Sequence, residues 1–245
     1  MTKEIKVPVA DILSARKDTS NDMLVNGSDI AERKAFEEKL KETNEQLKAQ
    51  EASGDAVAKA ELLLDKVNSL LALGRKKDIW NDAKKAFDVF IENHRWEQAA
   101  ETCDVMYQTE QEGAIKAMIH GIWLAVSFPV DPEVSVILLD HLVDETPPNA
   151  DGAAVAAATA HYLVGLRASE EAFENLDFYT TRLLSTVAEK HSRVSSQDMM
   201  DEWLERMQLK DPAVFLPRLG MVLNAVVPLD EWWFDRDELR KLFPQ

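Results

Sequence analysis

Residues 78–107 constrain the fold most, because apolar side chains recur there every three or four positions on both sides of a short polar break. A recurrence of this kind is typical of amphipathic helices. The break at 93–95 predicts a tight turn between two helices, with Asp78 as the cap of the first. The predicted inward-facing residues of the first helix are Ile79, Ala83, Ala86, Phe87, Phe90 and Ile91, and those of the second are Trp96, Ala99, Ala100, Cys103 and Met106.

The composition favours the same secondary structure for the rest of the chain. Only eight of the 245 residues are glycine, which argues against a β-sandwich with its many turns and against glycine-rich nucleotide loops. Hydrophobic residues make up 46% of the chain and charged residues 29%, enough for a folded core. We therefore predict an all-α fold, an irregular stack of antiparallel helix pairs that is solenoid-like or a compact bundle.

Breaks in the apolar period divide the chain into four parts. Helix pairs are expected to begin near residues 79, 113 and 153, and capping residues are expected at Asp29, Asp55, Asp131, Ser169, Ser195, Asp211 and Asp235. The predicted parts are an extended N-terminal arm (1–28), a helical hairpin (29–74), a main helical-repeat-like body (75–228) and an aromatic C-terminal tail (229–245).

The second helix of the pair at 78–107 resembles a tetratricopeptide repeat. That motif has a bulky aromatic residue opening its second helix and a small residue three positions later, and Trp96, Ala99, Cys103 and Met106 follow this pattern. Small residues let two helices approach closely, while the aromatic ring fills the gap near the turn. The resemblance covers about one repeat and implies a helical-repeat architecture.

The formal net charge of −16 excludes some classes of partner. A strongly acidic surface repels phosphate backbones and anionic lipids, and the longest basic run is Arg75-Lys76-Lys77. No apolar run reaches membrane-spanning length, and a single cysteine, Cys103, fits a reducing compartment. We expect a cytoplasmic protein that binds neither nucleic acid nor membrane. Its acidic charge either serves solubility alone, the interpretation we favour, or steers it toward a basic patch on a protein partner.

Motifs that would indicate catalysis are absent from the sequence. One cysteine and five dispersed histidines do not form a zinc motif, and there is no P-loop, GxGxxG or GxSxG. We expect no catalytic residue, cofactor or metal, and an inert buried thiol at Cys103. His120 and His161 lie in apolar helices, where a histidine is either a hydrogen-bonded core residue or part of a pocket.

Partner contacts are instead expected at the two ends of the chain. Three adjacent large rings cannot all face one core from a regular backbone, so the tail either docks on the body or presents a ring to a partner, or does both. The N-terminal arm is either a flexible segment or one that docks on a partner through its apolar residues. The candidate partner-binding residues are Val7, Val9, Ile12 and Leu13 in the arm and Trp232, Trp233 and Phe234 in the tail.

These observations favour a non-catalytic helical interaction protein, an accessory or scaffold subunit of a larger cytoplasmic complex. The expected partner is a larger enzyme or a multi-subunit complex. One alternative is an assembly chaperone or regulator of an enzyme. Another is an enzyme or small-ligand-binding helical domain with a pocket near His120 and His161.

Overall fold

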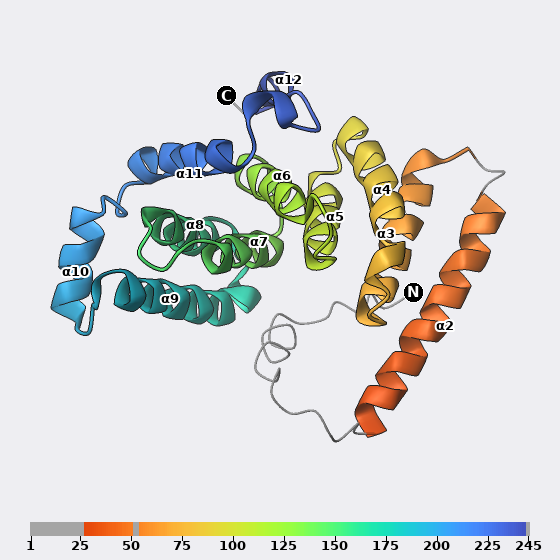
Figure 1. The fold of residues 1–245 in the computed structure, drawn as a ribbon, viewed down its shortest axis with the longest axis horizontal. Coiled ribbons are helices and arrows are strands. Elements are labelled where there is room, and N and C mark those ends of the chain that lie inside the picture. The colour runs from red at the N-terminus through yellow and green to blue at the C-terminus, as the bar shows by residue number, and fades with distance from the viewer. Residues whose placement is uncertain (1–26, 51–53, 244–245) are drawn as a thin grey trace.

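The computed structural model describes residues 27–50 and 54–243, with side chains from residue 30 onward. Within these residues every regular element is a helix, and no strand occurs (Figure 1). The elements are α2 (Gly27–Gln50), α3 (Ala56–Ala72), η1 (Lys76–Asp78), α4 (Trp80–Glu92), α5 (Trp96–Gln108), α6 (Ala114–Ser127), α7 (Pro132–Glu145), α8 (Asp151–Arg167), α9 (Glu170–Ser192), α10 (Gln197–Arg206), α11 (Pro212–Val226), η2 (Leu229–Glu231) and α12 (Arg236–Arg240).

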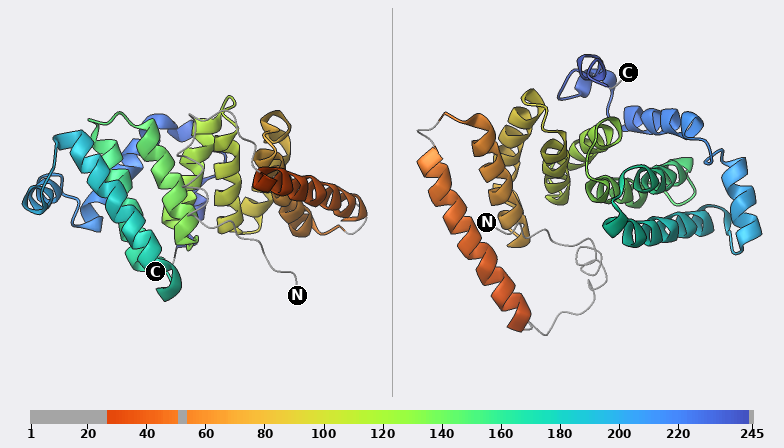
Figure 2. Two further views of the ribbon diagram at one scale, coloured as in Figure 1. Left: turned by 90° about the horizontal axis from the view of Figure 1, so that it is seen from below. Right: turned by 180° about the vertical axis from the view of Figure 1, so that it is seen from behind.

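Helices that follow one another in the sequence mostly pack side by side. From α2 to α9 each helix contacts the next, which makes an elongated stack with α2 at one end and α10 at the other (Figures 1 and 2). Helix α11 then runs back over α8 to α6 and brings the end of the chain to the middle of the stack. The prediction of an all-α stack of helix pairs is confirmed, and the pairs begin at α4, α6 and α8, within two residues of the expected positions.

Capping side chains explain where several helices begin. Asp55, Asp131, Ser169 and Asp211 each accept a hydrogen bond from a backbone N–H two or three residues later. Such a bond satisfies one of the unpaired N–H groups at a helix N-terminus. All four caps agree with the sequence prediction, as does Asp235, which accepts from two backbone N–H groups at the start of α12.

The other three predicted caps, Asp29, Asp78 and Ser195, are wrong. Asp78 does not cap α4, because it lies in η1 and accepts hydrogen bonds from the guanidinium of Arg75 at 2.9 and 3.2 Å. Ile79 occupies the cap position of α4 without a side-chain hydrogen bond. Helix α10 is capped by Ser196 rather than by Ser195, because two adjacent serines compete for the role and the sequence pattern does not separate them.

Helix α2 is a charged rod that lies on α3 along one narrow seam. It begins at Gly27, so Asp29 lies within its first turn rather than at the predicted cap. Leu40 and Thr43 are buried in the seam and Leu47 packs beside them, as the sequence spacing predicts. The remaining faces of α2 are mostly exposed.

The centre of the stack is built from closely spaced helices. The alanine-rich helix α8 is buried from residue 153 to residue 160 and packs against α7, α9 and α11. Helices α5 and α6 nearly touch at Gly121, where an added Cβ would lie 2.8 Å from Cβ of Cys103. Cys103 is completely buried, and burial raises the pKa of its thiol well above the usual value, so the predicted buried thiol is confirmed.

Candidate functional site

The three consecutive rings of the C-terminal tail pack on the protein's own helices. We refer to residues 229–243, the part of the predicted tail that the structure describes, as the aromatic tail. After α11 the chain turns at Pro228 into η2, and Trp232, Trp233 and Phe234 follow before α12 begins. All three rings are half-buried and contact side chains from α4 and α6.

Trp233 lies at the middle of this contact and joins two helices. Its ring stacks on His120 of α6, with centroids 4.3 Å apart and planes inclined by 18°. It also meets α4 edge-on, at 5.4 Å from the ring of Phe87 and 6.3 Å from the ring of Trp80. Edge-to-face and offset-stacked pairs at these distances add stability beyond the burial of area alone.

Trp232 and Phe234 complete a cluster around the same histidine. Their ring centroids lie 4.8 Å and 5.4 Å from His120, and both rings contact Trp123 one turn along α6, at 6.0 and 5.3 Å. The expectation that three adjacent rings cannot all face one core applies to a regular backbone, and the segment here is not regular. Because Trp232 is extended after the 3₁₀ turn, the backbone is irregular and curves around His120, so neighbouring side chains reach it from different sides.

His120 is completely buried, and both its ring nitrogens are hydrogen-bonded. The Nδ1 atom lies 2.6 Å from the carbonyl oxygen of Lys116, and the backbone N–H of Trp233 donates to Nε2 at 2.9 Å. A backbone N–H can only donate, so Nε2 carries the lone pair and Nδ1 carries the proton. Burial is the main reason that the pKa of His120 falls from 6.5 to about 4, and the imidazole is therefore neutral at pH 7.

Cationic side chains surround the aromatic cluster. Lys84 of α4 lies 5.4 Å from the ring centroid of Trp233, and Arg236 of α12 lies 4.0 Å from that of Trp232. Lys116 of α6 forms an ion pair with Glu231 of η2 at 2.8 Å. Cations over aromatic faces stabilise the docked tail, and the same three positive charges further lower the pKa of His120.

His161 has different neighbours. Its Nδ1 lies 3.1 Å from the hydroxyl of Thr180 and 3.8 Å from the carboxylate of Asp177, both on α9. Within the described part of the chain, the structure does not bring His161 and His120 together. A pocket shared by the two histidines would need them to converge on open space, whereas the space around His120 is filled by the rings of the aromatic tail.

The surroundings of the tail include Trp80 and Phe87, two residues that the sequence interpretation did not assign to a site. Trp80 and Phe87 are seven residues apart on α4, and His120 and Trp123 are three apart on α6, so each pair lies on one helix face. This spacing predicts an aromatic face on each of the two helices. It did not indicate that the faces meet the tail, because the contact with Trp233 spans 113 residues.

A second polar group joins three helices elsewhere in the stack. The Nε2 atom of His141 on α7 lies 2.8 Å from a carboxylate oxygen of Asp104 on α5, and the ring of Tyr107 packs 4.5 Å from the imidazole. Tyr179 of α9 donates to Asp140 at 2.7 Å. Both contacts join residues that are far apart in sequence, so no local sequence motif predicts them. We interpret them as links between helices.

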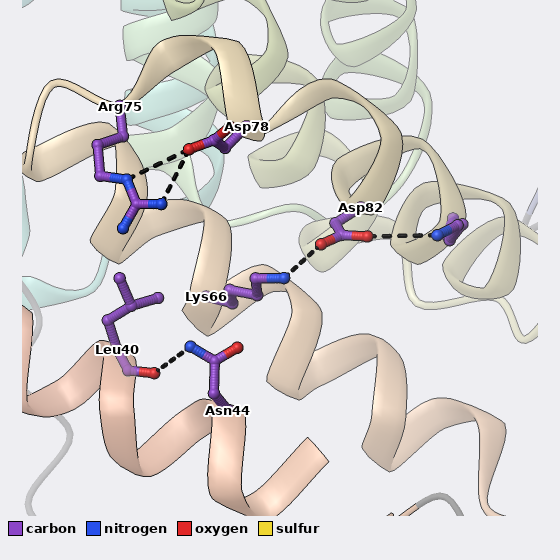
Figure 3. Close-up of polar contacts among 7 residues, drawn as sticks. Leu40, Asn44, Lys66, Arg75, Asp78 and Asp82 are labelled. Atoms are coloured by element: carbon purple, nitrogen blue, oxygen red, sulfur yellow. Dashed lines mark hydrogen bonds and ion pairs between the residues drawn. The ribbon is translucent and has the colours of Figure 1, made fainter. Parts of the chain in front are cut away.

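An open groove of about 600 Å³ lies between α2 and the end of α3 (Figure 3). Its lining mixes both charges, and Arg75 in that lining already forms an ion pair with Asp78. Nearby, Lys66 of α3 donates to Asp82 of α4 at 2.6 Å. Burial alone would raise the pKa of Asp82, but hydrogen bonds and charges from Lys66 and Lys85 lower it below 3.8. Both arginines of the lining are paired, Arg33 with Glu37 and Arg75 with Asp78, so we interpret this groove as a junction between helices rather than as an anion site.

The chain matches no protein-family model, no curated protein and no solved structure. In the ranges 27–50 and 54–243, no helix is both long and apolar enough to cross a membrane, and no three metal-ligating side chains gather at one point. The candidate partner-binding residues of the arm, Val7, Val9, Ile12 and Leu13, lie outside the described residues.

Proposed function

We propose that this protein is a non-catalytic helical interaction protein, an accessory or scaffold subunit of a larger cytoplasmic complex, and that its C-terminal end contacts the partner. One observation carries the proposal: several large apolar side chains are exposed in the aromatic tail and in the part of α11 that precedes it. Within residues 221–242 these are Met221, Val226, Leu229 and Leu242.

Exposed aliphatic groups of this size are common singly, whereas several in one segment are typical of an interaction surface. Leu229, 72% exposed, is only three residues from Trp232, and aromatic rings are favoured energetic centres of interfaces. Acidic residues stand next to the apolar ones, with Asp230 and Glu231 following Leu229. The partner that fits this surface has an apolar pocket rimmed by lysine and arginine, which agrees with the net charge of −16.

The elongated stack supports a scaffolding role. Helix pairs packed in a row, which we propose to be related in form to tetratricopeptide repeats, offer a long surface for a small number of residues. The proposed contact uses Trp232, Trp233 and Phe234 together with the aliphatic residues around them.

The test compares two substitutions of the same kind at different places. Leu229→Glu alters the proposed contact, and Phe178→Glu alters an equally exposed position on α9, where the side chain is 70% exposed. The partner is identified by affinity capture from the native source with the unmodified protein, and its Kd is then measured with purified components for all three proteins.

We expect Leu229→Glu to raise the Kd at least tenfold and Phe178→Glu to leave it within about twofold, because burying an added carboxylate at an interface is costly. Equal affinities for the two variants would refute the assignment of the contact. A stable complex of fixed stoichiometry indicates a subunit, whereas a partner that leaves when its own assembly is complete indicates a chaperone.

A further inference from the structure

We propose that His120 is a proton-sensitive latch: neutral His120 holds the aromatic tail against α4 and α6, and its protonation releases the tail. This inference rests on the geometry of the cluster and does not depend on the proposed function.

The latch is a single hydrogen bond whose direction allows only one protonation state. The backbone N–H of Trp233 donates to Nε2 of His120 at 2.9 Å, while Nδ1 already donates to the carbonyl oxygen of Lys116. A second proton would occupy the lone pair of Nε2 and place two N–H groups opposite each other. Protonation thus removes the acceptor and leaves the buried N–H of Trp233 without its partner, which is unfavourable away from water.

The charges around the ring act in the same direction. Lys116 from α6, Lys84 from α4 and Arg236 from α12 all oppose a positive charge on the imidazole. Glu231 from η2 is the carboxylate beside them, and it is engaged by Lys116 at 2.8 Å. An imidazolium in the docked state would therefore be buried among cations, and this energy is relieved when the tail detaches and water reaches the ring.

The tail is attached in a way that allows it to move as a unit. It begins after Pro228, just beyond α11, and Arg236 of α12 donates a hydrogen bond to Asn224 on α11 itself. Phe243 after α12 packs against Trp123 and Phe128 at the end of α6. Release would break the contacts to α4 and α6 while leaving the bond between α12 and α11 intact. The three rings, half-buried in the docked state, would then be presented to solvent.

The size of the effect follows from proton linkage. In the docked state the pKa of His120 is lowered from 6.5 to about 4, mainly by burial. A histidine that regains a pKa of 6.5 on release favours the released form increasingly as the pH falls below 6.5, so the ratio of released to docked tail rises by up to about 30-fold between pH 8 and pH 5.

Hydrogen exchange of the full chain measures this ratio. Amides of residues 229–243 are followed by mass spectrometry at pH 8, 6 and 5, with each rate corrected for the intrinsic pH dependence of exchange. The variant His120→Gln keeps an amide oxygen that can accept from Trp233 and has no titrating group. The control His161→Gln removes a histidine outside the aromatic cluster.

We expect the opening of residues 229–243 to increase, by up to about 30-fold, from pH 8 to pH 5 in the unmodified protein and in His161→Gln, and to stay nearly constant in His120→Gln. The same increase in all three proteins, or no increase in the unmodified one, overturns the proposal.

Nitrogen-15 NMR of the histidine side chains provides a check that needs no variant. The proposal requires the Nδ1–H tautomer of His120 at pH 7 and an apparent pKa for His120 well below 6.5. An Nε2–H tautomer at pH 7 would overturn it even if His120→Gln failed to fold.

Discussion

Trp96 and Phe128 stack face to face, with ring centroids 4.0 Å apart and planes inclined by 13°. Trp96 opens α5, and Phe128 follows the last residue of α6. The imidazole of His94, which lies in the turn before α5 with a φ of 58°, packs on Trp96 as well, at 5.1 Å. The indole therefore fills the space between the α4–α5 turn and the end of α6, and it ties one helix pair to the next.

Replacing this ring tests how much it contributes to stability. Trp96→Ala should lower the free energy of unfolding by about 3 kcal/mol, near the low end for buried aromatic truncations because Trp96 is half-buried. Trp96→Phe keeps a ring that can stack on Phe128 and should lose about 1 kcal/mol. Urea unfolding measures both values. A loss below 1 kcal/mol for Trp96→Ala would mean that the ring does not fill the gap between the pairs.

The close approach of α5 and α6 gives a matched pair of glycine substitutions. Gly121→Ala would place a Cβ 2.8 Å from Cβ of Cys103 and 3.1 Å from a methyl group of Leu138, so the helices must separate, at a cost of about 1–3 kcal/mol. Gly165→Ala adds the same methyl group to α8 with no atom within 4 Å and should stabilise the protein by about 0.5–1 kcal/mol through helix propensity. Thermal unfolding of both variants shows whether each substitution raises or lowers the stability of the protein. Equal effects would contradict the close packing.

Arg167 closes the C-terminal end of α6. Its guanidinium donates to the carbonyl oxygen of Ala125 at 2.6 Å and to that of Val126 at 3.2 Å. Arg167→Ala should cost about 2 kcal/mol, because these carbonyl groups lose a charged donor at a partly buried helix end. The lysine of Arg167→Lys can reach at most one of the two carbonyl oxygens, so the stability of this variant should lie between those of the unmodified protein and Arg167→Ala. Denaturant unfolding measures all three proteins. An equal free energy of unfolding for Arg167→Lys and the unmodified protein would show that the paired hydrogen bonds do not matter.

Stability should fall in acid through His120. Its pKa is about 4 in the folded protein and 6.5 in the unfolded chain, so the unfolded state binds the proton more tightly. The contribution of neutral His120 to the free energy of unfolding is complete above pH 6.5 and is lost as the pH falls from 6.5 toward 4. By pH 5 the loss reaches up to about 2 kcal/mol relative to His120→Gln, and it is smaller where the tail detaches first. Urea midpoints at pH 7.5 and pH 5 measure it. Parallel changes in both proteins would exclude His120 as the cause.

The helical stack was predictable because local patterns determine it. Capping residues such as Asp55 and Asp131 act on N–H groups two or three positions away, so sequence reveals them directly. The errors at Asp78 and Ser195 arise where two neighbouring residues can both serve as the boundary. The seam of α2 through Leu40 and Thr43 was visible for the same local reason.

The candidate site was visible in part. The aromatic tail stood out as a run of three rings, and His120 as a polar residue on an apolar helix. Their contact depends on α11 running back along the stack, which is a property of tertiary packing and leaves no mark in the local pattern. The direction of the hydrogen bond from Trp233 to His120 and the lowered pKa follow from that contact, so they could not be inferred from the sequence.

The place of Trp233 against α4 and α6 also affects how the chain is completed during synthesis. Residues 80–127 can form their helices and pack as soon as they are made, but the aromatic face shared by α4 and α6 is covered only after residue 233 has been translated. Until then the rings of Trp80, Phe87 and Trp123 remain without the tail that covers them, and an early-folded part of the protein carries an apolar surface for more than 100 further residues of translation.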